Sequence, residues 1–449
     1  MNVANLALQQ TPPILVPLRF FLTAPIFALF ACLLGLYDGL TLFTERWNLE
    51  VLALTHLITL GFISMTMIGA FLQLITVLTG ICVPRPQLIS VLLHGFLTLG
   101  TLCLAAGFLI PHHNLVSMGW LSLSVAFGLF LLIAGYCLIR AVTTPITVAM
   151  RLAVLSLLIT MSLGIILGRV FSHGVELSMP DALTNLHMVW GLIGWVTSLI
   201  IGVAYQIVPM FHVTPPYPQR LMKLLVPSLF LTIVVWNIVY IMAKLHYLPN
   251  IIAISIGGLI GLELMTFAIF TLYIHRKRLR KIPDVTLNFW NVGMISLIVA
   301  IIIWYVGAIL DLMNYSFFPM VVGILFLAGF LLPVIQGTLY KVVPFLVWLH
   351  LENLQLGASK PMPITIPTMR QIIPYKMGHY QFLVYLIGLI LTLAAIFWIN
   401  LIYVGIAMLT FAFLFLGYNL YRASWTYWVI SQKLEVHLPP SPSNRMDGH

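Results

Sequence analysis

Apolar stretches long enough to cross a bilayer alternate with short polar segments along the whole chain. An α-helix needs roughly 20 apolar residues to span the hydrocarbon core. The pattern therefore predicts twelve transmembrane helices, and because a helix satisfies its own backbone in lipid, an all-α integral membrane fold. The expected spans are 14–40, 50–79, 87–110, 116–139, 150–170, 186–209, 223–243, 249–274, 289–312, 318–346, 380–400 and 402–421.

One apolar pattern recurs three times along the chain. Its copies contain the sequences GAFLQ, GVAYQ and GTLYK, which align on Gly69, Gly202 and Gly337. The offsets are 202 − 69 = 133 and 337 − 202 = 135 residues. A fixed period indicates an internal repeat, so we expect three pseudo-threefold-related repeats of four helices. These repeats, within a membrane domain covering 1–433, are about 14–140, 150–275 and 289–421.

The composition excludes a soluble globular protein. Hydrophobic residues are 61% and charged residues 7% of the 449 residues, against roughly 45–50% and 25% in soluble domains. The net charge of +10 does not indicate a nucleic-acid partner, because the basic residues lie in loops. Four cysteines lack any C-x-x-C or C-x-x-C-H spacing, so we expect neither a disulfide framework nor covalently attached haem.

The distribution of lysine and arginine predicts the orientation in the membrane. The loops after the second, fourth, sixth, eighth and tenth spans are basic, whereas the opposite loops contain only Arg46, Arg169 and Lys244. Basic loops stay in the cytoplasm, so both termini should be cytoplasmic in a multi-pass protein of the bacterial inner membrane. The start of the chain lacks the features of a cleavable signal peptide. We expect the HRKRLRK loop to rest on anionic lipid and residues 434–449 to form a disordered cytoplasmic tail.

Two histidines are the first candidate metal ligands. His56 and His187 begin the second and sixth spans, at the same depth near the outer surface. Neutral imidazole binds haem iron and copper, and an ionisable residue in a membrane span usually faces the bundle interior. The alternative is a hydrogen bond to a neighbouring helix at the headgroup level.

Small residues and one lysine are further candidates for a cofactor site. Gly61, Gly69 and Gly202 could leave room for a flat macrocycle, although close helix packing explains each glycine equally well. Lys341 lies at the inner end of the tenth span, where it could meet a haem propionate, a quinone oxygen or a proton. The alternative is that its ammonium group extends to the cytoplasmic surface.

Other polar residues in the spans are candidates for a proton path. Glu263 lies in the middle of the eighth span, where an unpaired carboxylate is costly. Gln73, Tyr205 and Gln206 lie near the inner ends of the second and sixth spans. Structural hydrogen bonds between helices are the alternative for each of these residues.

The remaining histidines are weaker candidates. An outer group could form a surface copper or zinc site, although its spacing does not require one: His112, His113, His173 and His246. A second group lies toward the cytoplasm: His94, His212, His275, His350 and His379.

Twelve helices in threefold repetition, with outer histidines on the second and sixth, resemble subunit I of the haem-copper oxidases. The segment HLITLGFISMTMIGAFLQLITVLTG is similar to a segment of the NnrS group of haem- and copper-containing membrane proteins. The resemblance implies haem b, with or without copper. It also implies that His56 is a haem ligand and that His187 occupies a metal-ligand position.

The chain departs from the oxidases at two ligand positions. Its seventh span has no histidine pair and its tenth has no His-x-His, so the full oxygen-reducing centre cannot assemble and a standard proton-pumping oxidase is not expected. We expect electron transfer, or the handling of nitric oxide or another diatomic gas, with a quinone, cytochrome or other separate electron donor. The alternative is a transporter, assembly factor or non-catalytic subunit that uses the scaffold without a redox centre.

Overall fold

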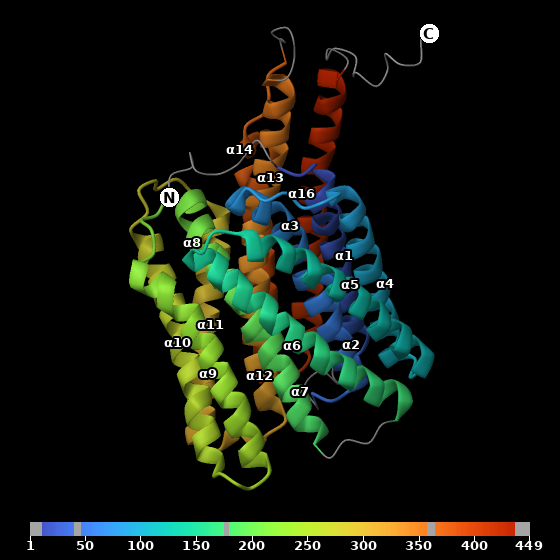
Figure 1. Ribbon diagram of the computed structural model, residues 1–449, viewed down its shortest axis with the longest axis vertical. Helices are drawn as coiled ribbons and strands as arrows, with labels where there is room; N and C mark the ends of the chain where they lie inside the picture. Colours follow the sequence, from blue (N-terminus) through green and yellow to red (C-terminus); the bar gives the residue numbers. More distant parts are fainter. Residues whose placement is uncertain (1–10, 40–45, 175–178, 357–363, 436–449) are drawn as a thin grey trace.

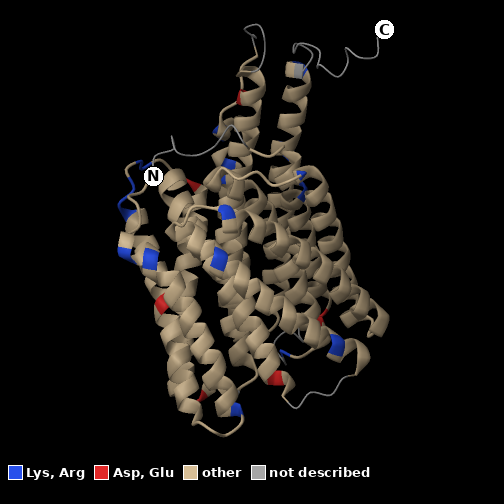
Figure 2. Ribbon diagram, in the orientation of Figure 1, with Lys and Arg blue, Asp and Glu red and all other residues tan. Residues whose placement is uncertain are grey.

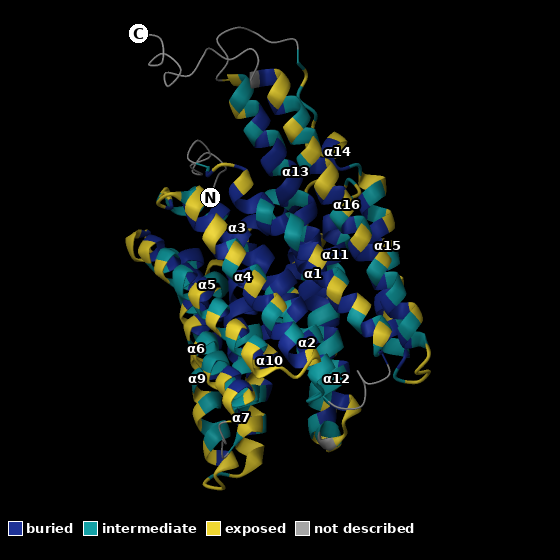
Figure 3. Cartoon of the chain, turned by 90° about the vertical axis from the view of Figure 1, so that its right-hand side faces the viewer, coloured by how far each residue is buried: buried dark blue, intermediate teal, exposed yellow. Residues whose placement is uncertain are grey.

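The protein is an all-helical bundle (Figure 1). The computed structural model describes residues 11–39, 46–174, 179–356 and 364–435, and these residues contain no β-strand. Twelve of their helices are long and apolar enough to cross a membrane, which confirms the predicted number. Large apolar side chains cover much of the outside of the bundle while its middle is buried, as lipid solvation requires (Figure 3).

Nine of the twelve spans are single uninterrupted helices. They are α1 (Leu15–Tyr37), α4 (Pro86–Leu109), α5 (His113–Arg140), α6 (Pro145–His173), α9 (Gln219–Lys244), α10 (Asn250–Arg276), α11 (Val285–Ile309), α15 (Tyr375–Ala394) and α16 (Leu401–Glu435).

The second, sixth and tenth spans each contain a π-helical stretch between two α-helical parts. The second is α2 (Leu49–His56), η4 (Leu57–Ser64) and α3 (Met65–Thr79); the sixth is α7 (Pro180–Met188), η5 (Val189–Thr197) and α8 (Ser198–His212); the tenth is α12 (Phe317–Ile324), η7 (Leu325–Leu331) and α13 (Leu332–Leu356). π-helical turns are rare and occur frequently at functional sites. Here they occur in the three spans that carry the recurring apolar pattern.

Two helices extend further than the hydropathy predicts. The tenth span was expected to end at 346 and the twelfth at 421, but α13 continues to Leu356 and α16 to Glu435. Figure 1 shows both rising beyond the rest of the bundle, and the rings of His350 and Tyr427 are in contact at 6.4 Å. Hydropathy marks where a helix leaves lipid, whereas the helix itself continues until its backbone is interrupted.

The segment between α13 and α15 contains a short helix, α14 (Met369–Ile372), as expected for an interfacial segment. A short 3-10 helix, η6 (Leu312–Asn314), precedes α12. The predicted disordered tail, 434–449, lies outside the described residues except for its first two, which continue α16.

Three pairs of glycines bring the second, sixth and tenth spans against the helix that precedes each of them. A methyl group added at any of the six would lie 2.9 Å or less from a side-chain atom of that helix. The contacts are Gly61–Phe27 and Gly69–Phe20 with α1, Gly194–Ser156 and Gly202–Ala149 with α6, and Gly329–Ser296 and Gly337–Phe289 with α11. Only glycine permits this approach.

The spacing of these contacts is the same in all three spans. The glycines of each pair are eight residues apart (69 − 61, 202 − 194 and 337 − 329), and their partners are seven apart (27 − 20, 156 − 149 and 296 − 289). The difference of one residue matches the single residue that a π turn inserts into an α-helix.

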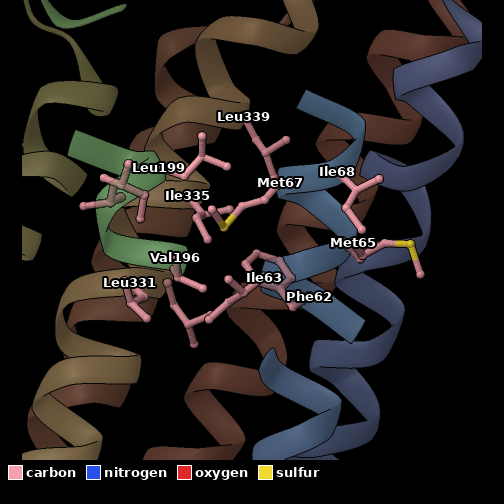
Figure 4. Close-up of a cluster of buried hydrophobic side chains, with 14 of the residues drawn as sticks. Phe62, Ile63, Met65, Met67, Ile68, Val196, Leu199, Leu331, Ile335 and Leu339 are labelled. Atoms are coloured by element: carbon pink, nitrogen blue, oxygen red, sulfur yellow. The ribbon is translucent and has the colours of Figure 1, made fainter. Parts of the chain in front are cut away.

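An apolar cluster fills the space where the second, sixth and tenth spans meet (Figure 4). Ile63, Val196 and Leu331 lie close together at its centre, each two residues after the first glycine of its pair. The residues between are large and fully or almost fully buried aromatics: Phe62, Trp195 and Phe330. The centre of the bundle is therefore closed by side chains of all three spans.

We expect Gly61→Ala to lower the stability of the folded protein, because its new methyl group would collide with the Phe27 ring. Overpacking a tight contact typically costs about 1–3 kcal/mol. The matched control is Gly128→Ala in α5, where no atom lies within 4 Å of the new methyl and helix propensity rises by up to about 1 kcal/mol. Thermal unfolding in detergent measures both; equal melting temperatures for the two variants would contradict the packing role.

Candidate functional site

His56 and His187 hold equivalent positions at the outer ends of their spans. His56 is the last residue of α2 before η4, and His187 is the second-last of α7 before η5. His56 Nδ1 lies 2.7 Å from the carbonyl oxygen of Leu52, and His187 Nδ1 lies 3.0 Å from that of Thr160 in α6. The two residues are close enough for a charge on one ring to act on the other.

Aromatic and small residues surround this outer pair. The His56 ring is 5.7 Å from the ring of Phe108 in α4, and the methyl-free surface of Gly164 in α6 faces Cε1 of His187 at 3.0 Å. Arg46 donates a hydrogen bond to Oδ1 of Asn185, and Asn185 in turn donates to the Tyr240 hydroxyl. These bonds connect the start of the second span to α7 and α9.

The hydrogen bonds of the pair determine which ring nitrogen is free to bind a ligand. A carbonyl oxygen only accepts, so Nδ1 of each imidazole carries the proton and Nε2 keeps its lone pair. A metal-binding histidine commonly donates its second ring nitrogen to a backbone carbonyl in this way. The donor atoms of His56 and His187 therefore fit a metal ion or a haem iron.

No third protein ligand joins the pair. Within the described part of the chain, no three His, Cys, Asp or Glu side chains lie close enough to hold a metal ion together. The outer-loop histidines are included: His113 Nδ1 bonds to the carbonyl of Phe171, and His173 Nδ1 to the Ser172 hydroxyl. A centre at His56 and His187 would therefore rely on these two nitrogens and on non-protein ligands.

The three candidate glycines do not form a cradle for a macrocycle. The space beside Gly61, Gly69 and Gly202 is filled by Phe27, Phe20 and Ala149. This favours close helix packing over the alternative of a haem site at these positions. A planar haem cannot lie against these glycines unless α1 and α6 move away.

Lys341, the third member of the Gln73/Gln206/Lys341 alignment, is an ion-pair partner. Its Nζ lies 2.6 Å from Oδ2 of Asp284, and both side chains are about one-fifth exposed. Asp284 is also the N-cap of α11, where Oδ1 accepts from the Thr286 amide. The lysine is thus held by a carboxylate that the sequence did not connect with it.

A buried imidazole array near the inner end is the main feature that sequence reasoning missed. His212 Nδ1 lies 3.0 Å from His275 Nε2, and His275 Nδ1 lies 2.8 Å from Oδ1 of Asn291. The histidines are only 6% and 3% exposed, and the Trp290 ring meets both edge-on. Because the amide oxygen accepts, the protons point from His212 through His275 to Asn291.

The sequence contained one weak indication of this array. His212 and His275 both end apolar spans on the same side of the membrane, but they are 63 residues apart and come from α8 and α10. Only the packing of these helices against α11 brings the rings together.

The residues predicted for a proton path are buried but separate. Among the described residues, no hydrogen bond connects Gln73, Tyr205, Gln206 and Glu263. Glu263 accepts from the Thr232 hydroxyl of α9 at 3.2 Å. Oε1 of Gln73 and the hydroxyl of Tyr205 are buried without a partner.

A second tyrosine links the region of Tyr205 to α10. The ring of Tyr217 is 5.3 Å from that of Tyr205, and burial raises the pKa of its hydroxyl, which stays protonated. Because Thr271 Oγ1 already donates to the Phe267 carbonyl, Tyr217 donates to Thr271 at 3.0 Å. Thr271 lies eight residues after Glu263 on the same face of α10.

No protein-family model matches this chain. No curated protein matches it either.

We expect Asp284→Asn and Lys341→Met each to destabilise the protein by about 1–3 kcal/mol, because each leaves a partly buried charge unpaired. Asparagine still caps α11, so the loss in Asp284→Asn isolates the charge. The double variant should recover at least about 1 kcal/mol of the summed loss. Thermal unfolding of all four proteins gives the coupling, and strictly additive effects would rule the ion pair out as a stabilising contact.

Proposed function

We propose that the chain is a membrane metalloprotein in which His56 and His187 hold one metal centre, the iron of haem b or a copper ion. The observation that carries the proposal is the hydrogen bonding of the pair. Each Nδ1 bonds to a backbone carbonyl, which leaves two Nε2 lone pairs at the outer ends of neighbouring spans. The two π-helical stretches directly after the histidines add support, because such turns gather at functional sites.

The metal would supply one-electron chemistry or a binding position for a diatomic gas such as nitric oxide. The role of the protein is to fix both imidazoles in the ligand tautomer and to keep the surroundings apolar through Phe108 and Gly164. A copper ion needs only the two nitrogens and a small further ligand. A haem also needs space, which the filled glycines Gly61, Gly69 and Gly202 do not provide.

We also infer that the bundle consists of three four-helix repeats related by a pseudo-threefold axis, with boundaries near 14–140, 150–275 and 289–421. The three glycine pairs support this inference. Each pair has the same internal spacing, follows or overlaps a π-helical stretch and contacts the first helix of its own repeat at partners seven residues apart.

The orientation follows from the basic loops. Lysine and arginine gather toward the end of the bundle where the described chain starts and α16 ends (Figure 2). The positive-inside rule assigns that end to the cytoplasm. We propose a bacterial inner-membrane location with both termini cytoplasmic, so that the His56–His187 centre lies on the outer side, within reach of a quinone, a cytochrome or another separate electron donor.

A second candidate function uses the same scaffold without a metal. Buried polar atoms without a partner lie along α3 and α8: Thr66, Gln73, Thr76 and Tyr205. Bound water or a small polar substrate would satisfy them. This observation favours a transporter, which stands beside an assembly factor or a non-catalytic subunit as the alternative to a redox protein.

Purified protein should contain about one metal centre per chain, measured by an absorbance spectrum and elemental analysis. His56→Ala and His187→Ala should each lose most of it, since removing a ligand from a two-histidine site typically costs 10–100-fold or more in affinity. A Soret band would identify haem, and copper without a Soret band would identify the copper ion.

The matched control is His350→Ala. His350 makes the same Nδ1 bond to the carbonyl four residues earlier, but its Nε2 faces the carbonyl of Pro12 and is not free. The control should retain the metal of the unmodified protein. Colourless, metal-free protein from a haem- and copper-replete host would reject the proposal and favour the transporter.

A further inference from the structure

A groove of about 680 Å³ runs along the outer surface between α15 and α16. Its walls are almost entirely apolar. The side chains used below are Tyr380 and Val384 of α15, and Met408, Phe411, Phe415 and Tyr418 of α16. Phe411 and Tyr418 are more than half exposed, so the groove faces lipid and not the bundle core.

Two cations continue the groove at one end. Lys376 lies one turn before Tyr380, and Arg422 lies one turn after Tyr418, so each shares the face of its helix that lines the groove. Both are exposed. The only ion pair found among the described residues is Lys341–Asp284, so neither cation is neutralised by an acidic side chain there.

The register of the two helices brings these cations to the same level. Gly388 packs against Leu409, and Gly405 packs against Thr392. The residue numbers of both contacts add to the same value (388 + 409 = 405 + 392 = 797), as in an antiparallel pair. In this register residue 376 is opposite residue 421, next to Arg422.

Their depth corresponds to the surface of the bilayer. Lys376 is 394 − 376 = 18 residues from the far end of α15, and Arg422 is 422 − 401 = 21 residues from the far end of α16. At 1.5 Å per residue these lengths are roughly 27 and 32 Å, about one hydrocarbon thickness. The exposed aromatics Tyr421, Trp425 and Trp428 lie at this level and beyond it, as in an interfacial belt.

We propose that this groove is a binding site for one anionic glycerophospholipid. Its acyl chains lie along Val384, Met408 and Phe411, and its phosphate lies between Lys376 and Arg422. The guanidinium group binds phosphate with paired N–H donors, and the ammonium adds a point charge. Charge selects the ligand: a zwitterionic lipid fills the same groove with less attraction to the two cations.

The site is independent of the proposed metal centre, because it lies on the lipid-facing side of α15 and α16 and shares no residue with His56 or His187. A loss of lipid selectivity would therefore leave the metal content unchanged, and the reverse also holds.

Native mass spectrometry of the full-length protein, with palmitoyl-oleoyl phosphatidylglycerol or phosphatidylcholine added, tests the proposal. The unmodified protein should retain one phosphatidylglycerol more firmly than phosphatidylcholine. The double variant Lys376→Gln/Arg422→Gln should lower phosphatidylglycerol retention roughly tenfold, because each cation near an anionic headgroup contributes substantially. Val384→Trp, which fills the groove, should lower the retention of both lipids.

Arg220→Gln/Lys223→Gln is the matched control, since these two cations are also exposed, at the start of α9 on the same side of the bundle, away from the groove. It should keep the selectivity. Equal retention of both lipids by the unmodified protein, or equal losses in the two double variants, would overturn the proposal. Unchanged retention in Val384→Trp would overturn the placement of the acyl chains.

Discussion

Close backbone contact at glycine determines how this bundle assembles. Helices that are already in lipid gain little from apolar contact, so packing and polar contacts decide which faces meet. Gly61 and Gly69 set the second span against Phe27 and Phe20 of α1 with no room for a methyl group. The same contact at the sixth and tenth spans brings the three π-containing segments together around the Ile63, Val196 and Leu331 centre.

The polar groups inside the bundle follow from that assembly. A buried polar group in lipid is costly unless it is bonded, and the spans present bonding partners to one another. Asn185 connects Arg46 to Tyr240, Asn237 accepts from the Trp190 indole, and Lys341 meets Asp284. These contacts act as polar connections between helices. His56 and His187 differ from them, because each leaves one ring nitrogen free for a ligand.

Histidines occupy both ends of the same architecture with different roles. At the outer end, each ring bonds to a backbone carbonyl and keeps Nε2 available. At the inner end, His212 and His275 bond to each other and to Asn291 under the Trp290 ring. The first arrangement suits a metal ligand, while the second uses up its nitrogens in a directed hydrogen-bonded chain. The same residue type therefore supports metal binding at one end and helix association at the other.

The sequence by itself determined the twelve spans, because their length and apolar content are set by the bilayer thickness and do not depend on neighbours. It also singled out the recurring spans and the two outer histidines. It could not determine the partners of Lys341 or His212, because Asp284 and His275 lie on other helices and become neighbours only through packing. Nor could it distinguish a glycine that makes room for a ligand from one that admits Phe27. That distinction depends on which side chain the adjacent helix presents, and only the tertiary structure decides it.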